Sequence, residues 1–239
     1  MAFIKVQNDD GYVLIDDTFQ NFVHAKTETY RFYNVDQWGA WTENTTPFYY
    51  DGHANSSPIV AIRAAGGNTI PVPFNYTKSG NRYGFRFYGA RGSPAGGGSP
   101  QDAATGTIVV FDRPPIGAGL NGLLIVRDAA GRITYSSDLR YLNVLAELRS
   151  GQTMPTPANS GIIYASTTMG YARIQSGSYY GYQFATTFVR SRSNGVLDTE
   201  NRYFDSVLGT ANYPPPAGWP SNILIGTLRA LVVDLTGFV

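Results

Sequence analysis

The stretch VQNDDGYV at residues 6–13 has a counterpart about 120 residues later, VRDAAGRI at residues 126–133. Each copy places an apolar segment before a turn that carries Asn or Asp and ends in Gly, and an alternating segment after it. Such turns need backbone angles that Gly, Asn and Asp tolerate, so both stretches predict a β-hairpin. A repeat on this scale indicates the architecture before any chemistry can be argued.

Three further pairs of stretches recur in the same order along the chain. They are ANSSPIVA (54–61) with ANSGIIYA (158–165), SGNRYGFRF (79–87) with SGSYYGYQF (176–184), and TIVVFD (107–112) with LVVDL (231–235). Short β segments with Gly resemble one another anywhere, which is the alternative explanation, but the shared order favours a tandem duplication. We expect an all-β fold of two related antiparallel β-sandwich halves in tandem, residues 1–116 and 117–239, with few or no helices.

The predicted halves differ in their loops. The first half carries an aromatic insert at 30–50 and a Gly-rich stretch at 91–105, whose composition predicts a flexible loop. The second half carries a Pro-rich loop at 190–220, and Pro-rich loops are stiff and often serve as contact edges.

One segment, residues 138–150, fits two patterns. Its leucines are spaced by three between Asp138, a candidate N-cap, and Gly151, a candidate C-cap, which is typical of a helix. Apolar residues also alternate from 142 to 148, and the repeat aligns this segment with the strand that follows the first hairpin, near Phe22. We therefore expect a strand.

Composition excludes several classes of function. The 239 residues are 43% hydrophobic, which is enough for a core, and 18 basic residues against 17 acidic ones leave a formal net charge of +1. So balanced a charge gives no long-range attraction to nucleic acid or to an anionic membrane. The chain contains no run of about 18 apolar residues, so we expect no membrane span. We also expect no signal peptide, because the sequence from Met1 enters a strand pattern directly. Cysteine is absent, which excludes disulfides and thiolate sites and suits folding in a cytoplasm.

The sequence contains no motif for catalysis or for a cofactor. The histidines are His24, in a predicted strand, and His53, in a predicted loop, and neither lies in a zinc-binding spacing. A Ser-His-Asp triad would lack the GxSxG turn, and no phosphate-binding loop of the GxxxxGKS type occurs. We expect no enzyme activity, no metal and no cofactor.

Acidic residues near the first hairpin are the strongest chemical candidates. Asp9 and Asp10, with Asp16 and Asp17, could gather oxygens around calcium or act as a glycosidase pair. In the second copy Ala129 and Ala130 replace the first two acids while the glycine persists. The shared feature is therefore the turn, and calcium binding stays open.

Large aromatic residues on predicted loops are the candidates for contact with a partner or a glycan. They are Trp38, Trp41, Tyr49, Tyr50, Tyr213 and Trp219. Such residues can form a buried interface with a partner chain, a small core beneath a long loop, or a platform that stacks on sugar rings. We favour the interface.

The opening hairpin, the strands near 59–63, 83–87 and 108–112, and the second copy at 126–137 resemble small tail proteins of long-tailed, siphovirus-like bacteriophages. The resemblance implies a virion protein of the tail tip or tail fibre, made in the host cytoplasm, without catalytic residues. It implies other tail proteins as partners, a symmetric multi-copy assembly, and contact with a bacterial surface glycan or protein. The aromatic insert and the Pro-rich run at 213–220 depart from that pattern. A lectin-like receptor-binding module is the alternative.

Overall fold

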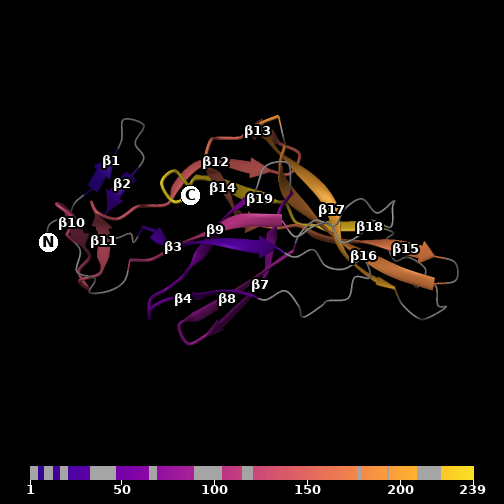
Figure 1. The fold of residues 1–239 in the computed structure, drawn as a ribbon, viewed down its shortest axis with the longest axis horizontal. Helices are drawn as coiled ribbons and strands as arrows, with labels where there is room; N and C mark the ends of the chain where they lie inside the picture. Colours follow the sequence, from indigo (N-terminus) through magenta and orange to yellow (C-terminus); the bar gives the residue numbers. More distant parts are fainter. Residues whose placement is uncertain are drawn as a thin grey trace.

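The computed structural model describes an all-β protein. It describes residues 5–7, 13–16, 21–32, 47–64, 69–88, 104–114, 121–176, 179–192, 194–208 and 222–239. All the regular secondary structure in these ranges consists of β-strands, which confirms the all-β prediction (Figure 1).

A six-stranded antiparallel sheet runs through the middle of the molecule (Figure 1). In spatial order its strands are β12 (Asn143–Arg149), β19 (Arg229–Asp234), β14 (Ser160–Ser166), β5 (Ile59–Ala64), β9 (Ala104–Asp112) and β3 (Val23–Phe32). Three of these strands belong to each predicted half, and β14 pairs with β5 where Ile162 faces Ile62. The two ranges therefore share one continuous sheet, and the predicted boundary at 116–117 lies outside the described residues.

A second sheet has the order β13 (Thr153–Pro155), β17 (Val196–Leu208), β16 (Tyr179–Ser191), β15 (Met169–Ser176) and β18 (Asn222–Ile225), with β6 (Thr69–Ile70) also paired to β16. The prediction of a loop over 190–220 is wrong for residues 196–208, which form β17. The cause is a tight turn at Asn194 and Gly195, where Gly195 has a φ of +75° and the Arg192 N–H donates to the Val196 carbonyl at 2.8 Å. Asn-Gly is a strong hairpin signal that outweighs loop composition. Residues 209–221 lie outside the described residues.

The third sheet consists of β4 (Phe48–Asp51), β8 (Arg82–Tyr88) and β7 (Val72–Ser79). Both ends of the predicted aromatic insert are therefore strands, because β3 ends at Phe32 and β4 begins at Phe48, while residues 33–46 lie outside the described residues. The predicted flexible loop at 91–105 likewise ends in strand β9, and its residues 91–103 are not described.

Two hairpins lie together at one end of the molecule, at the left of Figure 1. They are β1 (Lys5–Gln7) with β2 (Val13–Asp16) and β10 (Ile125–Arg127) with β11 (Ile133–Ser136), and β2 contacts β11. The second turn has the predicted chemistry: Asp128 Oδ1 accepts the N–H groups of Ala130 and Arg132, and Gly131 has a φ of +77°. The first turn, residues 8–12, is not described.

Strands that the sequence repeat predicts to be equivalent have irregularities at similar positions. Lys5 faces Asp16 as Ile125 faces Ser136, and both hairpins shift register one residue later. The β3–β9 pair and the β12–β19 pair also each contain a bulge, after His24 and after Val144 respectively. A bulge adds one unpaired residue and bends its strand, so its position is a specific feature of a strand pair.

The segment at 138–150 contains strand β12, as predicted. β12 spans Asn143–Arg149 and pairs with β19 at the edge of the central sheet, and a turn precedes it. The prediction of a strand is therefore correct, but the alternation holds only in part: Leu148 is buried and Ala146 is half-buried, whereas Val144, beside the bulge, is 47% exposed.

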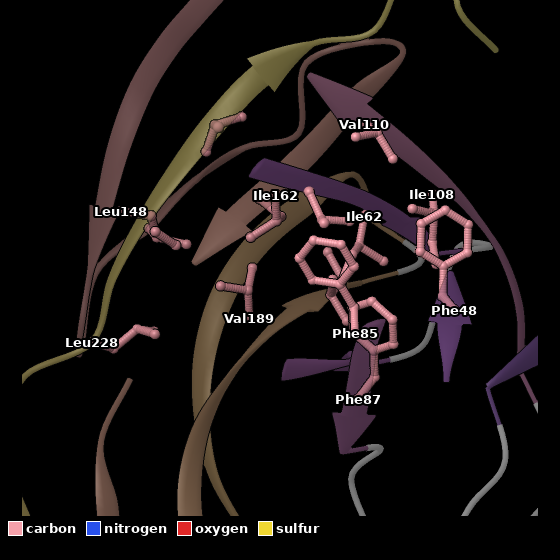
Figure 2. Close-up of a cluster of buried hydrophobic side chains, with 14 of the residues drawn as sticks. Phe48, Ile62, Phe85, Phe87, Ile108, Val110, Leu148, Ile162, Val189 and Leu228 are labelled. Atoms are coloured by element: carbon pink, nitrogen blue, oxygen red, sulfur yellow. The ribbon is translucent and has the colours of Figure 1, made fainter. Parts of the chain in front are cut away.

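Both faces of the central sheet are covered. On one face, Ile62, Ile108 and Ile162 point toward the aromatic rings of the three-stranded sheet and toward Val189 of β16 (Figure 2). The opposite face buries a smaller cluster, which consists of Ala61, Val109, Phe111, Ile163, Val233 and Leu235. Strands buried on both sides read as continuous apolar runs, as Ile108 to Phe111 does.

A buried carboxylate ties the three-stranded sheet to the central one. Asp112 is 1% exposed at the end of β9, and its Oδ2 accepts a hydrogen bond from the Tyr50 hydroxyl at 2.9 Å. Its Oδ1 accepts the N–H groups of Ser57 and Arg113, at 2.7 and 2.8 Å. A buried charge needs such donors, because an unpaired one is expensive to remove from water. Burial, followed by the bond to Asp112, raises the pKa of Tyr50.

We predict that Tyr50→Phe lowers the free energy of unfolding by about 1.5–3 kcal/mol, the usual range for a hydrogen bond to a charged group. The substitution removes only the hydroxyl that donates to Asp112. Tyr49→Phe is the matched control, because its ring is exposed, and we expect it to cost under about 0.5 kcal/mol. Chemical denaturation measures both values. If Tyr50→Phe were as stable as Tyr49→Phe, this role for Asp112 would be contradicted.

A second prediction concerns pH and His24. Its ring stacks on Phe238 with centroids 4.6 Å apart, and burial followed by the positive charge of Arg140 lowers its pKa below 6.5. The unfolded chain then binds the proton more tightly, so stability is complete above pH 6.5 and falls as the pH drops through that value. Thermal melts between about pH 7.5 and 5.5 should show this loss, and His24→Gln should reduce it. A His53→Gln control that removed the loss instead would refute the assignment.

Candidate contact surface on the three-stranded sheet

Strand β4 separates two neighbouring candidate residues onto opposite faces. Tyr50 points inward and is buried, whereas Tyr49 points outward with 41% of its surface exposed. The prediction that both lie on loops is therefore wrong, because alternation within a strand sends successive side chains to opposite faces. Tyr50 has a structural role, and Tyr49 is the exposed candidate.

The other four candidates lie outside the described residues. Trp38 and Trp41 belong to the range 33–46, and Tyr213 and Trp219 belong to the range 209–221. Their proposed contacts with a partner or a glycan stay predictions.

The ring of Tyr49 lies over a glycine. Tyr49 faces Gly84 on β8, and Gly84 faces Thr77 on β7, so the three residues form one row across the sheet. A Cβ added at Gly84 would come 3.2 Å from Tyr49 Cε1 and 2.5 Å from Thr77 Oγ1. The absence of a side chain there is what lets the aromatic ring and the hydroxyl approach each other across the middle strand.

Arg82 restrains the same ring. Its guanidinium lies 4.5 Å from the centroid of the Tyr49 ring, a cation–π contact, and its Nε lies 3.6 Å from Asp51 Oδ1. The ion pair is exposed and contributes little on its own. Stacking nevertheless limits the orientations of Tyr49, so less conformational entropy is lost when a partner covers the ring.

We call this outward face the Tyr49 surface; it consists of Tyr49, Asp51, Thr77, Arg82, Gly84 and Arg86. Two arginines and one acid make it mildly basic, and tyrosine and arginine are, with tryptophan, the residue types enriched at binding hot spots. Sequence reasoning found only Tyr49. The signal for the rest was the isolated glycine in RYGFRF, because glycine inside a strand often marks a close approach.

A second exposed tyrosine lies on the other face of the sheet. Tyr76 is 53% exposed at the edge strand β7, and its ring centroid lies 5.8 Å from that of Tyr83 and 5.6 Å from that of Phe85. Its ring packs at the edge of the core and not on the face that carries Tyr49. Variants of Tyr76 can therefore serve as controls for variants of Tyr49.

Both histidines engage protein groups. His53 Nε2 lies 2.9 Å from the Arg113 carbonyl oxygen, and its Nδ1 accepts the Asn55 N–H at 3.3 Å. His24 Nε2 lies 2.8 Å from Thr27 Oγ1. Within the described residues no three His, Cys, Asp or Glu side chains gather in a way that could hold a metal ion. Of the candidate calcium ligands only Asp16, on β2, is described.

Comparison with protein-family models, curated proteins and solved structures finds no match for this chain. The part of the chain that the structure describes contains no helix long and apolar enough to cross a membrane.

We predict that Gly84→Ala displaces Tyr49 or Thr77 and lowers the free energy of unfolding by about 1–3 kcal/mol, the range for overpacking. The shorter contact is with Thr77 Oγ1. Adding Thr77→Ala removes that oxygen, so the double variant should lose at least about 0.5 kcal/mol less than the sum of the single variants. Denaturation of all four proteins measures this coupling, and strictly additive losses would contradict the packing described here.

Proposed function

We propose that this protein is a structural component of a bacteriophage tail, in the tail-tip or fibre complex, which docks on neighbouring tail proteins through the Tyr49 surface. The observation that carries the proposal is the exposed ring of Tyr49, held in place over Gly84 by Arg82. A preorganised aromatic side chain beside arginines is what a docking hot spot needs. The resemblance of the hairpins and core strands to small tail proteins supplies the class.

The proposal includes a tandem duplication of one β-sandwich unit, with halves 1–116 and 117–239. The matched bulges support it, as does the order of the central sheet, in which β3, β9 and β5 have the same relative order as β12, β19 and β14. The register of β5 and β14 suggests a slightly different alignment from that of the sequence. Val60 pairs with Val110 and Ile162 pairs with Val232, so Val60 would correspond to Ile162. The similar stretches 54–61 and 158–165 instead align Val60 with Tyr164, two residues further along.

No catalytic step forms part of this function. The contacts of His53 and Tyr50 are those of structural residues, since each bonds a neighbouring loop or strand. A chain without cysteine suits synthesis in the host cytoplasm followed by assembly into the virion, where many copies would supply avidity.

The test is binding of the purified chain to the tip and fibre proteins encoded in the same genome. We expect a defined ring or trimer with one of them in sedimentation and native mass measurements. Tyr49→Ala should weaken that binding by about 30-fold, because a hot-spot residue contributes roughly 2 kcal/mol. Tyr76→Ala, which removes a tyrosine that is even more exposed (53% against 41%) from the other face, should leave it unchanged. A stable monomer with no affinity for any tail protein would rule out the proposal.

A lectin-like function is the second candidate, and the flat exposed ring of Tyr49 favours it. Sugar rings present C–H groups that pack on aromatic faces. Binding to a glycan array that Tyr49→Ala abolishes, or that Trp38→Ala with Trp41→Ala abolishes, would establish glycan recognition. Retained binding to tail proteins in the Trp38→Ala, Trp41→Ala variant would then separate the two functions, since Tyr49→Ala is expected to weaken docking as well.

A further inference from the structure

Strand β8 presents three contact points in one line on the Tyr49 surface. Arg82, Gly84 and Arg86 alternate with aromatic residues that are buried in the core, so the three lie together on the outward face. The ring of Tyr49 lies over Gly84, and the line therefore reads arginine, tyrosine, arginine. Residues two apart in a strand are separated by about 6.8 Å, so the two arginines flank the tyrosine at similar spacings.

Arg86 is the charge on this surface that lacks a counter-charge. Its side chain is half-buried, and it forms no ion pair or hydrogen bond with the residues that the structure describes. Arg82 has Asp51, whose Oδ1 lies 3.6 Å from its Nε. Two arginines against one aspartate leave this surface with a positive charge in excess. Such a surface is complementary to an acidic partner and repels a basic one.

The shape of the surface favours an extended partner. Tyr49 is 41% exposed on the outer side of a three-stranded sheet, and its ring is held by the guanidinium of Arg82, 4.5 Å from the ring centroid. Small molecules bind in concave pockets, whereas a sheet face offers a row of contacts at the spacing of a strand. The ring gives an apolar side chain of the partner a flat surface to cover.

We propose, on the basis of the docking function above, that the partner presents an extended acidic segment to the Tyr49 surface. Two acidic residues lie four positions apart in this segment, with an apolar residue midway between them. Side chains at alternate positions of an extended chain share one face and repeat at the same spacing as those of β8. The acids therefore reach Arg82 and Arg86, while the apolar residue covers Tyr49.

Labelled probes test the segment by fluorescence anisotropy on the full chain. The first is a nine-residue peptide with glutamate at positions 3 and 7, leucine at position 5 and threonine elsewhere. The second has lysine in place of both glutamates, the third moves the second glutamate to position 6, on the opposite face, and the fourth is trigalacturonate. We expect the first peptide to bind at least about tenfold more tightly than the second and about threefold more tightly than the third, because each exposed ion pair contributes up to about fivefold.

Each other result overturns part or all of the proposal. Equal binding of the first and second peptides would overturn the acidic class, and equal binding of the first and third would overturn the spacing. Tighter binding of trigalacturonate than of the first peptide would replace the protein segment with an acidic glycan. No binding of any probe would overturn the proposal as a whole.

Charge reversal assigns the contacts. Arg86→Glu should weaken binding of the first peptide at least about tenfold, and a peptide with lysine in place of one glutamate should restore it. The position that restores binding gives the direction of the segment. Arg113→Glu is the matched control, because it makes the same charge change at an exposed arginine outside the Tyr49 surface. Unchanged affinity in folded Arg86→Glu would refute the role of Arg86, and the probes on the unaltered protein decide if that variant does not fold.

The same variants separate the acidic segment from the docking function. If a tail protein binds the chain and Tyr49→Ala weakens that binding while Arg86→Glu does not, docking stands and the acidic segment is refuted. If the first peptide binds as expected but no tail protein does, the acidic chemistry of the surface stands and the tail function is refuted.

Discussion

The pairing of β5 with β14 is the constraint on which the rest of the structure depends. It joins three strands of each sequence half into one sheet, at Ile62 and Ile162. Both residues are almost fully buried in the larger core, between the central sheet and the sheets that cover it. Without this contact each half would expose an open strand edge and an uncovered apolar face. The larger core lies across this junction, so it requires the two halves together.

Asp112 extends that constraint to the surface. By accepting hydrogen bonds from Tyr50 and from the loop at Ser57, it holds the three-stranded sheet against the end of β9. Because β4 alternates, fixing Tyr50 inward directs Tyr49 outward, over Gly84. The orientation of the candidate docking residue is thus set by a buried polar contact one residue away, so a change at Tyr50 would also affect the position of Tyr49.

Local signals predicted the parts of this fold that need no long-range information. The turn at Asp128 and Gly131 follows from side-chain hydrogen bonding and a positive φ, which depend only on neighbouring residues. Alternation placed the strand at 143–149 correctly. Composition misled at 190–220, where the Pro-rich end obscured Asn194-Gly195 and the long strand that follows it. The isolated glycine at position 84 was also a readable sign that a side chain crosses β8.

The sequence by itself determined that this chain is built from strands, where the second hairpin turns, and which apolar runs are central, because these features follow from backbone preferences and from the period of two. Only the tertiary structure decided that both halves share one sheet and that Tyr50 is buried while Tyr49 is exposed. Those outcomes depend on contacts between residues far apart in the chain, such as Asp112 with Tyr50, which no local pattern encodes.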